Sequence, residues 1–260
     1  MFEGILADPL LTDLRTATDV MCEADPPERR ARHRAQGSMH SAMRDPILAD
    51  LIAWRPALEC LASIGFDQPT FTDGYVISKP PHSPRLFWHY DWFAWLDPSA
   101  YEPQPPQVFL MYYLTDTSRE NGCLRVVPGS HLEHNALHDL LDNPHSEALS
   151  RADDMSLPAF SFRPDEVDVP VKAGDLVIGD ARMLHAAPAN QSDERRTVIT
   201  LWFQPAFATL PEKVKAQMLK KTHPIPENWP EAAARKVRAL HPVYDGTAEP
   251  YARELYRPRA

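Results

Sequence analysis

Cysteine is scarce in this chain of 260 residues, which contains only Cys22, Cys60 and Cys123. The three are far apart, odd in number and form no C-x-x-C pair. Such a set argues against a disulfide scaffold and against a thiolate metal site. It favours a reducing compartment, so we expect a cytoplasmic protein.

Long apolar runs and a basic N-terminal leader are also missing. No run approaches the roughly 20 apolar residues that span a bilayer. The opening residues carry Glu3 and Asp8 and no basic region. The sequence therefore predicts neither a signal peptide nor a membrane partner.

Positive charge is in deficit, because 27 Lys and Arg residues face 36 Asp and Glu residues, for a net charge of −9. An acidic protein repels phosphate backbones, so we expect no nucleic-acid partner. The densest basic stretch, residues 29–34, is short and follows Glu28. We interpret it as a solvated segment.

Proline, by contrast, is abundant: its 27 residues are about twice the usual share of roughly 5%. Proline interrupts helix interiors and central strands. The composition therefore predicts short strands joined by loops, with few helices.

The hydrophobic pattern divides the chain into one domain with three parts: helical residues 1–66, a β core at 67–205 and a helical extension at 206–260. Helices are expected at 3–23, at 46–64 with Gly65 after its end, and at 231–240. A capping box, with Thr209 as N-cap and Glu212 three residues on, predicts another helix.

The core reads as a series of short strands rich in β-branched and aromatic residues. They are expected at 70–79, 86–95, 107–115, 123–127, 176–178 and 198–203. Segment 107–115 is apolar on both faces, which indicates a central strand. Polar, irregular residues 131–168 are interpreted as a lid or an insertion over a cavity. The order favours a mainly β fold, a double-sheet core with flanking N- and C-terminal helices.

The motif His89-Tyr90-Asp91 is the strongest indication of chemistry. Residues i and i+2 of a strand point to the same face, so His89 and Asp91 can chelate one metal. His185, just beyond a predicted strand, is the best third ligand. Two histidines and one carboxylate form the facial triad of non-haem Fe(II) oxygenases.

The H-x-D pattern is weakly specific by itself, and His131-Leu132-Glu133 and His145-Ser146-Glu147 compete with it. Those rivals lie in or beside polar, irregular sequence. The motif at residues 89–91 lies in an aromatic strand, where unpaired polar groups are costly. A hydrogen-bonded His–Asp pair without metal is the alternative there.

Arg196, eleven residues after His185, opens a strand that is otherwise apolar. A guanidinium that enters an interior requires a carboxylate partner, which its fork binds bidentately. Arg195 is interpreted as the surface residue of the pair.

Four ordered stretches together resemble the phytanoyl-CoA dioxygenase family of Fe(II)/2-oxoglutarate oxygenases. They are Lys79-Pro80-Pro81 with Trp88-His89-Tyr90-Asp91, residues 120–131 (ENGCLRVVPGSH), residues 174–177 (GDLV), and His185 followed by Arg196. They cover about residues 70–204.

The resemblance implies a double-stranded β-helix, a cupin-like jelly roll, with His89, Asp91 and His185 as iron ligands. It implies Arg196 as the anchor for the distal carboxylate of 2-oxoglutarate, and places Tyr75 and Met111 in the cosubstrate pocket. Arg34 is a looser match to a basic residue that reaches the cosubstrate. Ala187 departs from the family, which often has a serine there. The hydrogen bond that this serine makes to 2-oxoglutarate is therefore either absent here or replaced by one from Thr200 or a tyrosine.

The activity implied is oxidation of a small organic substrate with Fe(II), O₂ and 2-oxoglutarate, releasing succinate and CO₂. Asp91 favours hydroxylation or desaturation, because related halogenases lack this carboxylate. The resemblance fixes neither a substrate nor an oligomeric state. Lys79, His82 and Arg85 are open as binders of an acidic group.

Three alternatives stay open: a jelly-roll metalloenzyme that does not use 2-oxoglutarate, a non-catalytic binding module, and a hydroxylase of polymers or proteins. Arg196 argues against the first and the complete triad against the second. The third is disfavoured because the chain is acidic and has no accessory domain.

The histidines His131, His134, His138 and His145 could suggest a second metal site, but a solvated lid segment is the favoured interpretation.

Overall fold

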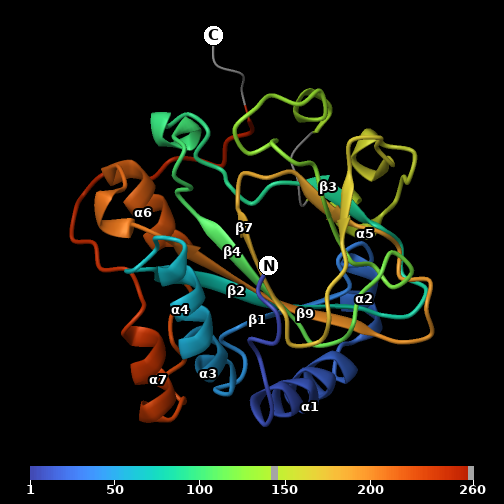
Figure 1. Cartoon of the computed structure of the whole chain (residues 1–260), viewed down its shortest axis with the longest axis horizontal. Helices are drawn as coiled ribbons and strands as arrows, with labels where there is room; N and C mark the ends of the chain where they lie inside the picture. Colours follow the sequence, from blue (N-terminus) through green and yellow to red (C-terminus); the bar gives the residue numbers. More distant parts are fainter. Residues whose placement is uncertain (142–145, 257–260) are drawn as a thin grey trace.

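Two antiparallel sheets form the centre of the molecule in the computed structural model, which describes residues 1–141 and 146–256 (Figure 1). The larger sheet has the strand order β1-β2-β9-β4-β7 and the smaller one β3-β8-β5-β6. The strands are β1 (Ser38–Ser41), β2 (Thr70–Lys79), β3 (Leu86–His89), β4 (Val108–Tyr113), β5 (Leu124–Val126), β6 (Val167–Val169), β7 (Leu176–Asp180), β8 (His185–Ala187) and β9 (Arg196–Gln204). The expected mainly β, double-sheet architecture is confirmed, and β4 is a central strand.

The two faces of the larger sheet serve different purposes. The register places Tyr75 of β2 beside Thr200 of β9, and Thr200 beside Met111 of β4. These three line a cavity on the inner face. Side chains alternate along a strand, so intervening residues such as Val76 and Leu201 point the other way and are fully buried in a separate core.

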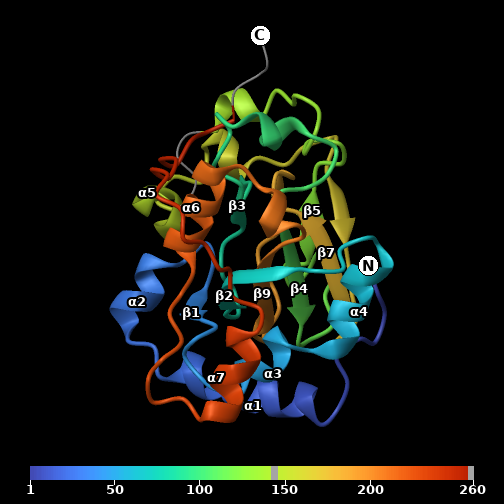
Figure 2. The same ribbon diagram turned by 90° about the vertical axis from the view of Figure 1, so that its left-hand side faces the viewer.

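Four helices cover that other face: α1 (Leu10–Glu23), α3 (Leu48–Ile52), α4 (Arg55–Ser63) and α7 (Glu231–Arg238). The buried residues of α5 (Glu147–Arg151) and α6 (Glu212–Lys221) join a second apolar cluster with residues of β3 and β8, and α2 (Pro27–Arg32) has no buried residue. Figures 1 and 2 show α1, α3 and α7 together at the lower end of the molecule. The buried residues of these three helices join those of the outer sheet face in one apolar cluster. No helix among the described residues has the length and apolar character to cross a membrane.

The two N-terminal helices differ from their expected bounds. The first begins at Leu10, because Phe2 instead forms a bridge with Leu176 at the edge of the larger sheet. The second is divided into α3 and α4. Pro56 has no backbone N–H, and its ring would clash with the carbonyl of Ile52, so α3 cannot continue through it. Pro56 instead occupies the first turn of α4.

Gly65 ends α4 as expected. Its φ of 91° is left-handed, its N–H donates to Ala62 O and the N–H of Phe66 donates to Leu61 O. That pair of bonds defines a Schellman C-terminus.

The predicted capping box was wrong. Thr209 ends a short 3₁₀ turn, η4 (Phe207–Thr209), and its hydroxyl donates to Ala206 O. The N-cap of α6 is Pro211, which offers no side-chain acceptor. The C-terminal extension is also less helical than expected, since no helix follows α7 among the residues described up to 256.

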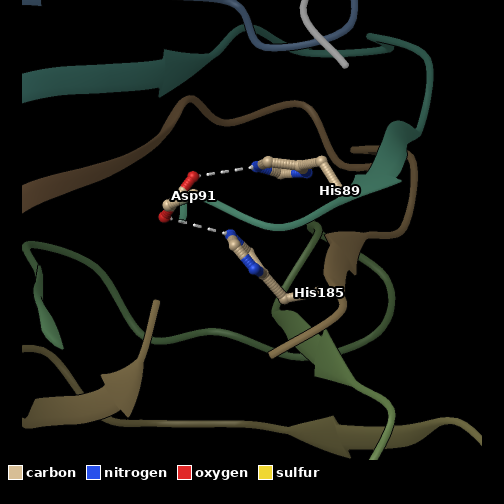
Figure 3. Close-up of side chains that lie close together, drawn as sticks. All are labelled: His89, Asp91 and His185. Atoms are coloured by element: carbon tan, nitrogen blue, oxygen red, sulfur yellow. Dashed lines mark ion pairs between the residues drawn. The ribbon is translucent and has the colours of Figure 1, made fainter. Parts of the chain in front are cut away.

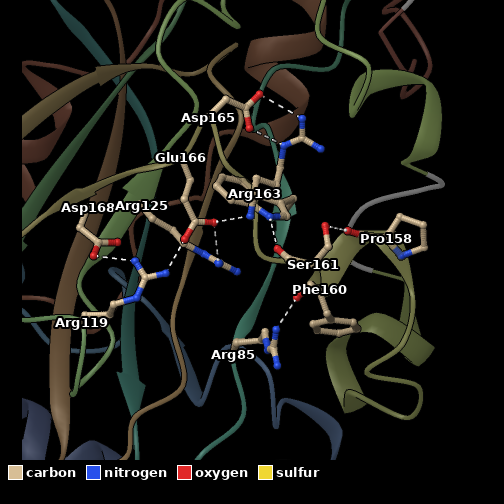
Figure 4. A network of polar contacts seen from close by, with 11 residues as sticks. Arg85, Arg119, Arg125, Pro158, Phe160, Ser161, Arg163, Asp165, Glu166 and Asp168 are labelled. Atoms are coloured by element: carbon tan, nitrogen blue, oxygen red, sulfur yellow. Dashed lines mark hydrogen bonds and ion pairs between the residues drawn. The ribbon is translucent and has the colours of Figure 1, made fainter.

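The described part of segment 131–168 is attached to the rest of the molecule by hydrogen bonds and ion pairs of arginine side chains. Arg125 of β5 is fully buried, and its Nη1 donates to Glu166 Oε2 at 3.0 Å. Arg119 bridges Glu166 and Asp168, and Arg85 Nη1 donates to Phe160 O at 2.8 Å (Figure 4). Charge-assisted bonds to buried groups are among the stronger polar contacts in proteins.

Residues 251–256, which we call the C-terminal strap, run over the segment that follows β3. Tyr251 Oη donates to Asp97 Oδ2 at 3.0 Å, and the N–H of Tyr256 donates to Tyr90 Oη at 2.7 Å. The ring of Tyr256 stacks on His138 with centroids 3.9 Å apart. The strap is therefore held at both of its ends.

His138 should make the stability of the protein depend on pH. Burial, followed by the neighbouring His134, lowers the pKa of His138 to about 4, and the N–H of Asn135 donates to its Nδ1. The unfolded chain then binds more protons between pH 6.5 and 4, so stability is fully present above pH 6.5 and is lost as the pH falls towards 4. Between pH 7.5 and 5 we expect a loss of about 2 kcal/mol from this group.

Urea unfolding of the wild type and of His138→Phe at the two pH values measures that loss. The phenylalanine preserves the ring stack and cannot titrate, so the variant should lose less stability than the wild type. Equal losses in the two proteins would show that His138 does not contribute.

Candidate metal centre and cavity

Two paired strands of the smaller sheet bring the three predicted ligands together. His89 is the last residue of β3, and His185, the first of β8, lies opposite it in the register. Asp91 lies two residues beyond β3. One donor atom from each of the three lies within 4.8 Å of the others, and Figure 3 shows both imidazoles turned towards the carboxylate.

The predicted strand 86–95 ends early, at His89. The N–H groups of Asp91 and Trp92 both donate to Ala181 O, at 2.8 and 2.9 Å, and not to a sheet neighbour. Asp91 Oδ2 also accepts a bond of 2.9 Å from Trp202 Nε1. The position of Asp91 is therefore set by these backbone bonds to Ala181 and by the side-chain bond from Trp202 of β9. The alternation of side chains along a strand does not determine it.

The two histidines use the same ring nitrogen, Nδ1, for a hydrogen bond to the backbone. Nδ1 of His89 bonds to Phe87 O and Nδ1 of His185 to Met183 O, both at 3.0 Å. Each Nδ1 therefore carries the proton. The Nε2 atoms lie 3.7 Å from the two oxygens of Asp91. Such outer bonds fix the orientation of metal-ligating histidines.

Electrostatics favour the same state. His89 is 5% exposed, and burial, with the neighbouring His185, lowers the pKa of His89 to about 3. A neutral imidazole is the form that binds metal. Two neutral imidazoles and one carboxylate fit Fe(II) and leave coordination positions open for other ligands.

The competing histidine motifs do not form a comparable site. In the described ranges, the triad is the one group of three His, Cys, Asp or Glu residues close enough to hold a metal. His134 pairs with Asp139 on the surface, whereas His138 packs against the strap. His145 lies outside the described residues. All three cysteines are buried and unpaired, as expected.

A cavity of about 390 Å³ lies between the two sheets and contains the triad in its wall. The predicted residues Arg196, Tyr75 and Met111 all line it. Arg196 is 4% exposed, and burial lowers the pKa of its guanidinium. The group stays charged, because arginine does not deprotonate in proteins.

Two of the cavity-wall polar atoms that lack a partner among the described residues belong to β9. They are Nε of Arg196 and Oγ1 of Thr200, both buried. Buried polar groups are rarely left unbonded, and each requires an explanation. Both point to an acidic ligand that they would bind in the cavity. Thr200 also offers a hydroxyl on the cavity wall, where Ala187 has none.

Four residues singled out in the sequence lie away from this cavity. Arg34 is exposed and does not line it. The ammonium of Lys79 is buried against Ala35 O and Pro84 O, and burial holds its pKa well below the usual value. His82 pairs with Asp193 on the surface. Arg85 is used in the network of Figure 4.

Other residues of the wall were missed. Asp73 lines the cavity, and burial raises its pKa to about 7. Its Oδ1 lies 3.0 Å from Nδ1 of His223. Lys221 and Arg253 line the cavity from the C-terminal part of the chain. Of these residues, only Asp73 could have been found from the sequence. It precedes Tyr75 by two residues on the same strand, and residues two apart on a strand share a face.

The fold and the site define a jelly-roll protein with a candidate two-histidine, one-carboxylate metal centre. The sequence model of the phytanoyl-CoA dioxygenase (PhyH) family matches residues 15–198. The chain belongs to this family.

Curated relatives agree with that assignment. Dioxygenase lolE1 of Epichloe uncinata is 31% identical over 197 residues, which are 74% of this chain and 66% of the relative. Phytanoyl-CoA dioxygenase domain-containing protein 1 of Mus musculus is 27% identical over 196 residues, or 71% of this chain. The match spans 61% of the length of the mouse protein.

Solved structures share the fold. The epimerase SnoN in complex with Fe³⁺, α-ketoglutarate and nogalamycin RO has a TM-score of 0.57 and 19% identity, with 99% of this chain and 90% of SnoN covered. HygX from Streptomyces hygroscopicus with nickel and 2-oxoglutarate has a TM-score of 0.56 and 20% identity, with 79% and 81% covered. At these identities the likeness extends to the fold alone.

Proposed function

We propose that this protein is an Fe(II)- and 2-oxoglutarate-dependent oxygenase that hydroxylates a small organic molecule and releases succinate and CO₂. One observation carries the proposal. A buried triad of His89, Asp91 and His185 shares a cavity with Arg196, a buried cation whose Nε has no partner among the described residues. When bound, Fe(II) supplies the activation of O₂ and the oxidising power.

The chain itself supplies ligands, orientation and exclusion of water. His89, Asp91 and His185 would hold the metal. Arg196 binds the distal carboxylate of 2-oxoglutarate, and Thr200 donates its hydroxyl to the same cosubstrate. Tyr75 and Met111 flank Thr200 on the neighbouring strands and close the pocket around the carbon chain.

An anaerobic titration with Fe(II) and 2-oxoglutarate tests the proposal. We expect the visible charge-transfer band of a 2-oxoacid chelated to iron in the wild type. The band should be absent in His185→Ala, because that variant loses a ligand. Iron bound at one equivalent without a band would favour the alternative, a jelly-roll metalloenzyme that does without 2-oxoglutarate. Failure to bind iron would favour a binding module.

A further inference from the structure

Two cationic side chains from the C-terminal part of the chain enter the cavity beside the same aromatic ring. Lys221 is the last residue of α6 and Arg253 belongs to the C-terminal strap; both line the cavity with Phe93. The Nζ of Lys221 lies 4.7 Å and the Cζ of Arg253 4.0 Å from the centroid of the Phe93 ring. An aromatic face attracts cations at such distances.

The strap fixes the position of Arg253. The N–H of Glu254 donates to Phe93 O at 2.8 Å, and Tyr251 is tied to Asp97. These bonds lie on either side of Arg253 in the sequence. They hold its guanidinium over Phe93, so Arg253 is a fixed part of the cavity wall.

Lys221 has no directly bonded counter-ion. Its ammonium forms no hydrogen bond or ion pair within residues 1–141 and 146–256, and the carboxylates of Asp91 and Asp73 act on its charge only from a distance. Burial lowers the pKa of Lys221 to about 8, which leaves it mainly charged at neutral pH. The two cavity carboxylates have other partners: Asp73 binds His223 and the N–H of Gly74, and Asp91 belongs to the metal triad. A desolvated charge is costly unless a ligand neutralises it.

The charges of the described cavity wall leave room for one more anion. Arg196, Lys221 and Arg253 are cationic, Asp91 is a carboxylate, and Asp73, with a pKa of about 7, is partly protonated at neutral pH. A bound Fe(II) dication and a 2-oxoglutarate dianion cancel one another. At least one positive charge among these five wall residues then remains in excess.

We propose that the substrate is a small organic anion whose carboxylate or phosphate binds at Lys221 and Arg253, with its apolar part against Phe93 and Trp202. The proposal rests on the proposed function for the role of that anion as a substrate. The anion site goes beyond the proposed function because it assigns two specificity-determining residues outside the triad and the cosubstrate pocket.

Binding of matched probes to the protein loaded with Fe(II) and saturating 2-oxoglutarate under anaerobic conditions tests this site. Saturating 2-oxoglutarate keeps Arg196 from binding the probes. Benzoate and benzamide have similar shapes and differ in charge. We expect benzoate to bind at least about 10-fold more tightly, the effect of one favourable ion pair. Lys221→Met and Arg253→Met should each abolish that preference and leave benzamide binding unchanged.

Lys220→Met is the matched control, because Lys220 precedes Lys221 on α6 but is exposed; it should behave as the wild type. Equal binding of benzoate and benzamide, no saturable binding of benzoate, or an unchanged preference in Lys221→Met would overturn the proposal. Phenyl phosphate distinguishes the two anions: tighter binding than benzoate assigns the site to phosphate esters, and weaker binding assigns it to carboxylates.

Failure of this proposal differs from failure of the proposed function. If the charge-transfer band forms in the wild type and in Lys221→Met but the probes are not discriminated, only the anion site is wrong. If the band is absent, the probes are titrated against the metal-free Arg196→Gln protein. A charge preference that depends on Lys221 there would preserve the anion site without the oxygenase.

Discussion

Asp91→Ala should lower the rate of succinate release by more than about 100-fold, because removal even of an outer hydrogen-bond partner of a metal ligand typically costs 10–100-fold. Asp91 supplies the only negative charge of the triad, with its two oxygens 3.7 Å from the imidazole nitrogens. Without it, two neutral imidazoles must hold the dication. Iron affinity, measured anaerobically, should fall together with turnover.

The fold should survive this substitution. The variant removes a buried carboxylate and leaves Trp202 Nε1 without its acceptor, a loss of about 1–3 kcal/mol. Asp193→Ala is a matched control, because that carboxylate is exposed. Trp202→Phe should give an intermediate result, a drop of about 10-fold in iron affinity. If Asp91→Ala keeps full iron-dependent turnover, the triad assignment is wrong.

The triad could be predicted because its signals are local. His89 and Asp91 are two residues apart in an aromatic segment, where two polar side chains require a reason. What the sequence could not show is how Asp91 is held. Strand β3 ends at His89, and the N–H of Asp91 bonds to Ala181 O, ninety residues away. The spacing rule therefore named residues that the structure brings together, but it assumed a strand where the backbone forms a loop.

The alternation of side chains along the strands also allowed residues of the cavity-lining sheet face to be predicted. Alternation along β2, β4 and β9 separates residues such as Tyr75 and Met111 from those that pack against helices. The C-terminal strap has no comparable pattern. Its place depends on single long-range contacts, such as the bond from the N–H of Tyr256 to Tyr90 Oη, and so the contribution of Arg253 to the cavity was missed.

Arg196→Gln should raise the dissociation constant of 2-oxoglutarate by at least about 100-fold, because loss of one partner of a buried charge pair costs about 3–5 kcal/mol. Arg196 is 4% exposed, and its Nε has no partner among the described residues. The cosubstrate is therefore expected to supply the compensating carboxylate. Titration of the charge-transfer band measures the constant directly.

A truncated oxoacid tests directly whether Arg196 contacts the distal carboxylate of 2-oxoglutarate. 2-Oxobutyrate keeps the oxoacid end that chelates iron but lacks the distal carboxylate. The wild type should bind 2-oxoglutarate far more tightly than 2-oxobutyrate, and Arg196→Gln should bind both with similar affinity, because the two changes remove the same interaction. Arg195→Gln is the control: Arg195 lies next to Arg196 but does not line the cavity, so its preference should match the wild type. If Arg196→Gln still prefers 2-oxoglutarate, another cation holds the distal carboxylate. Lys221 and Arg253 would then be the side chains to replace next.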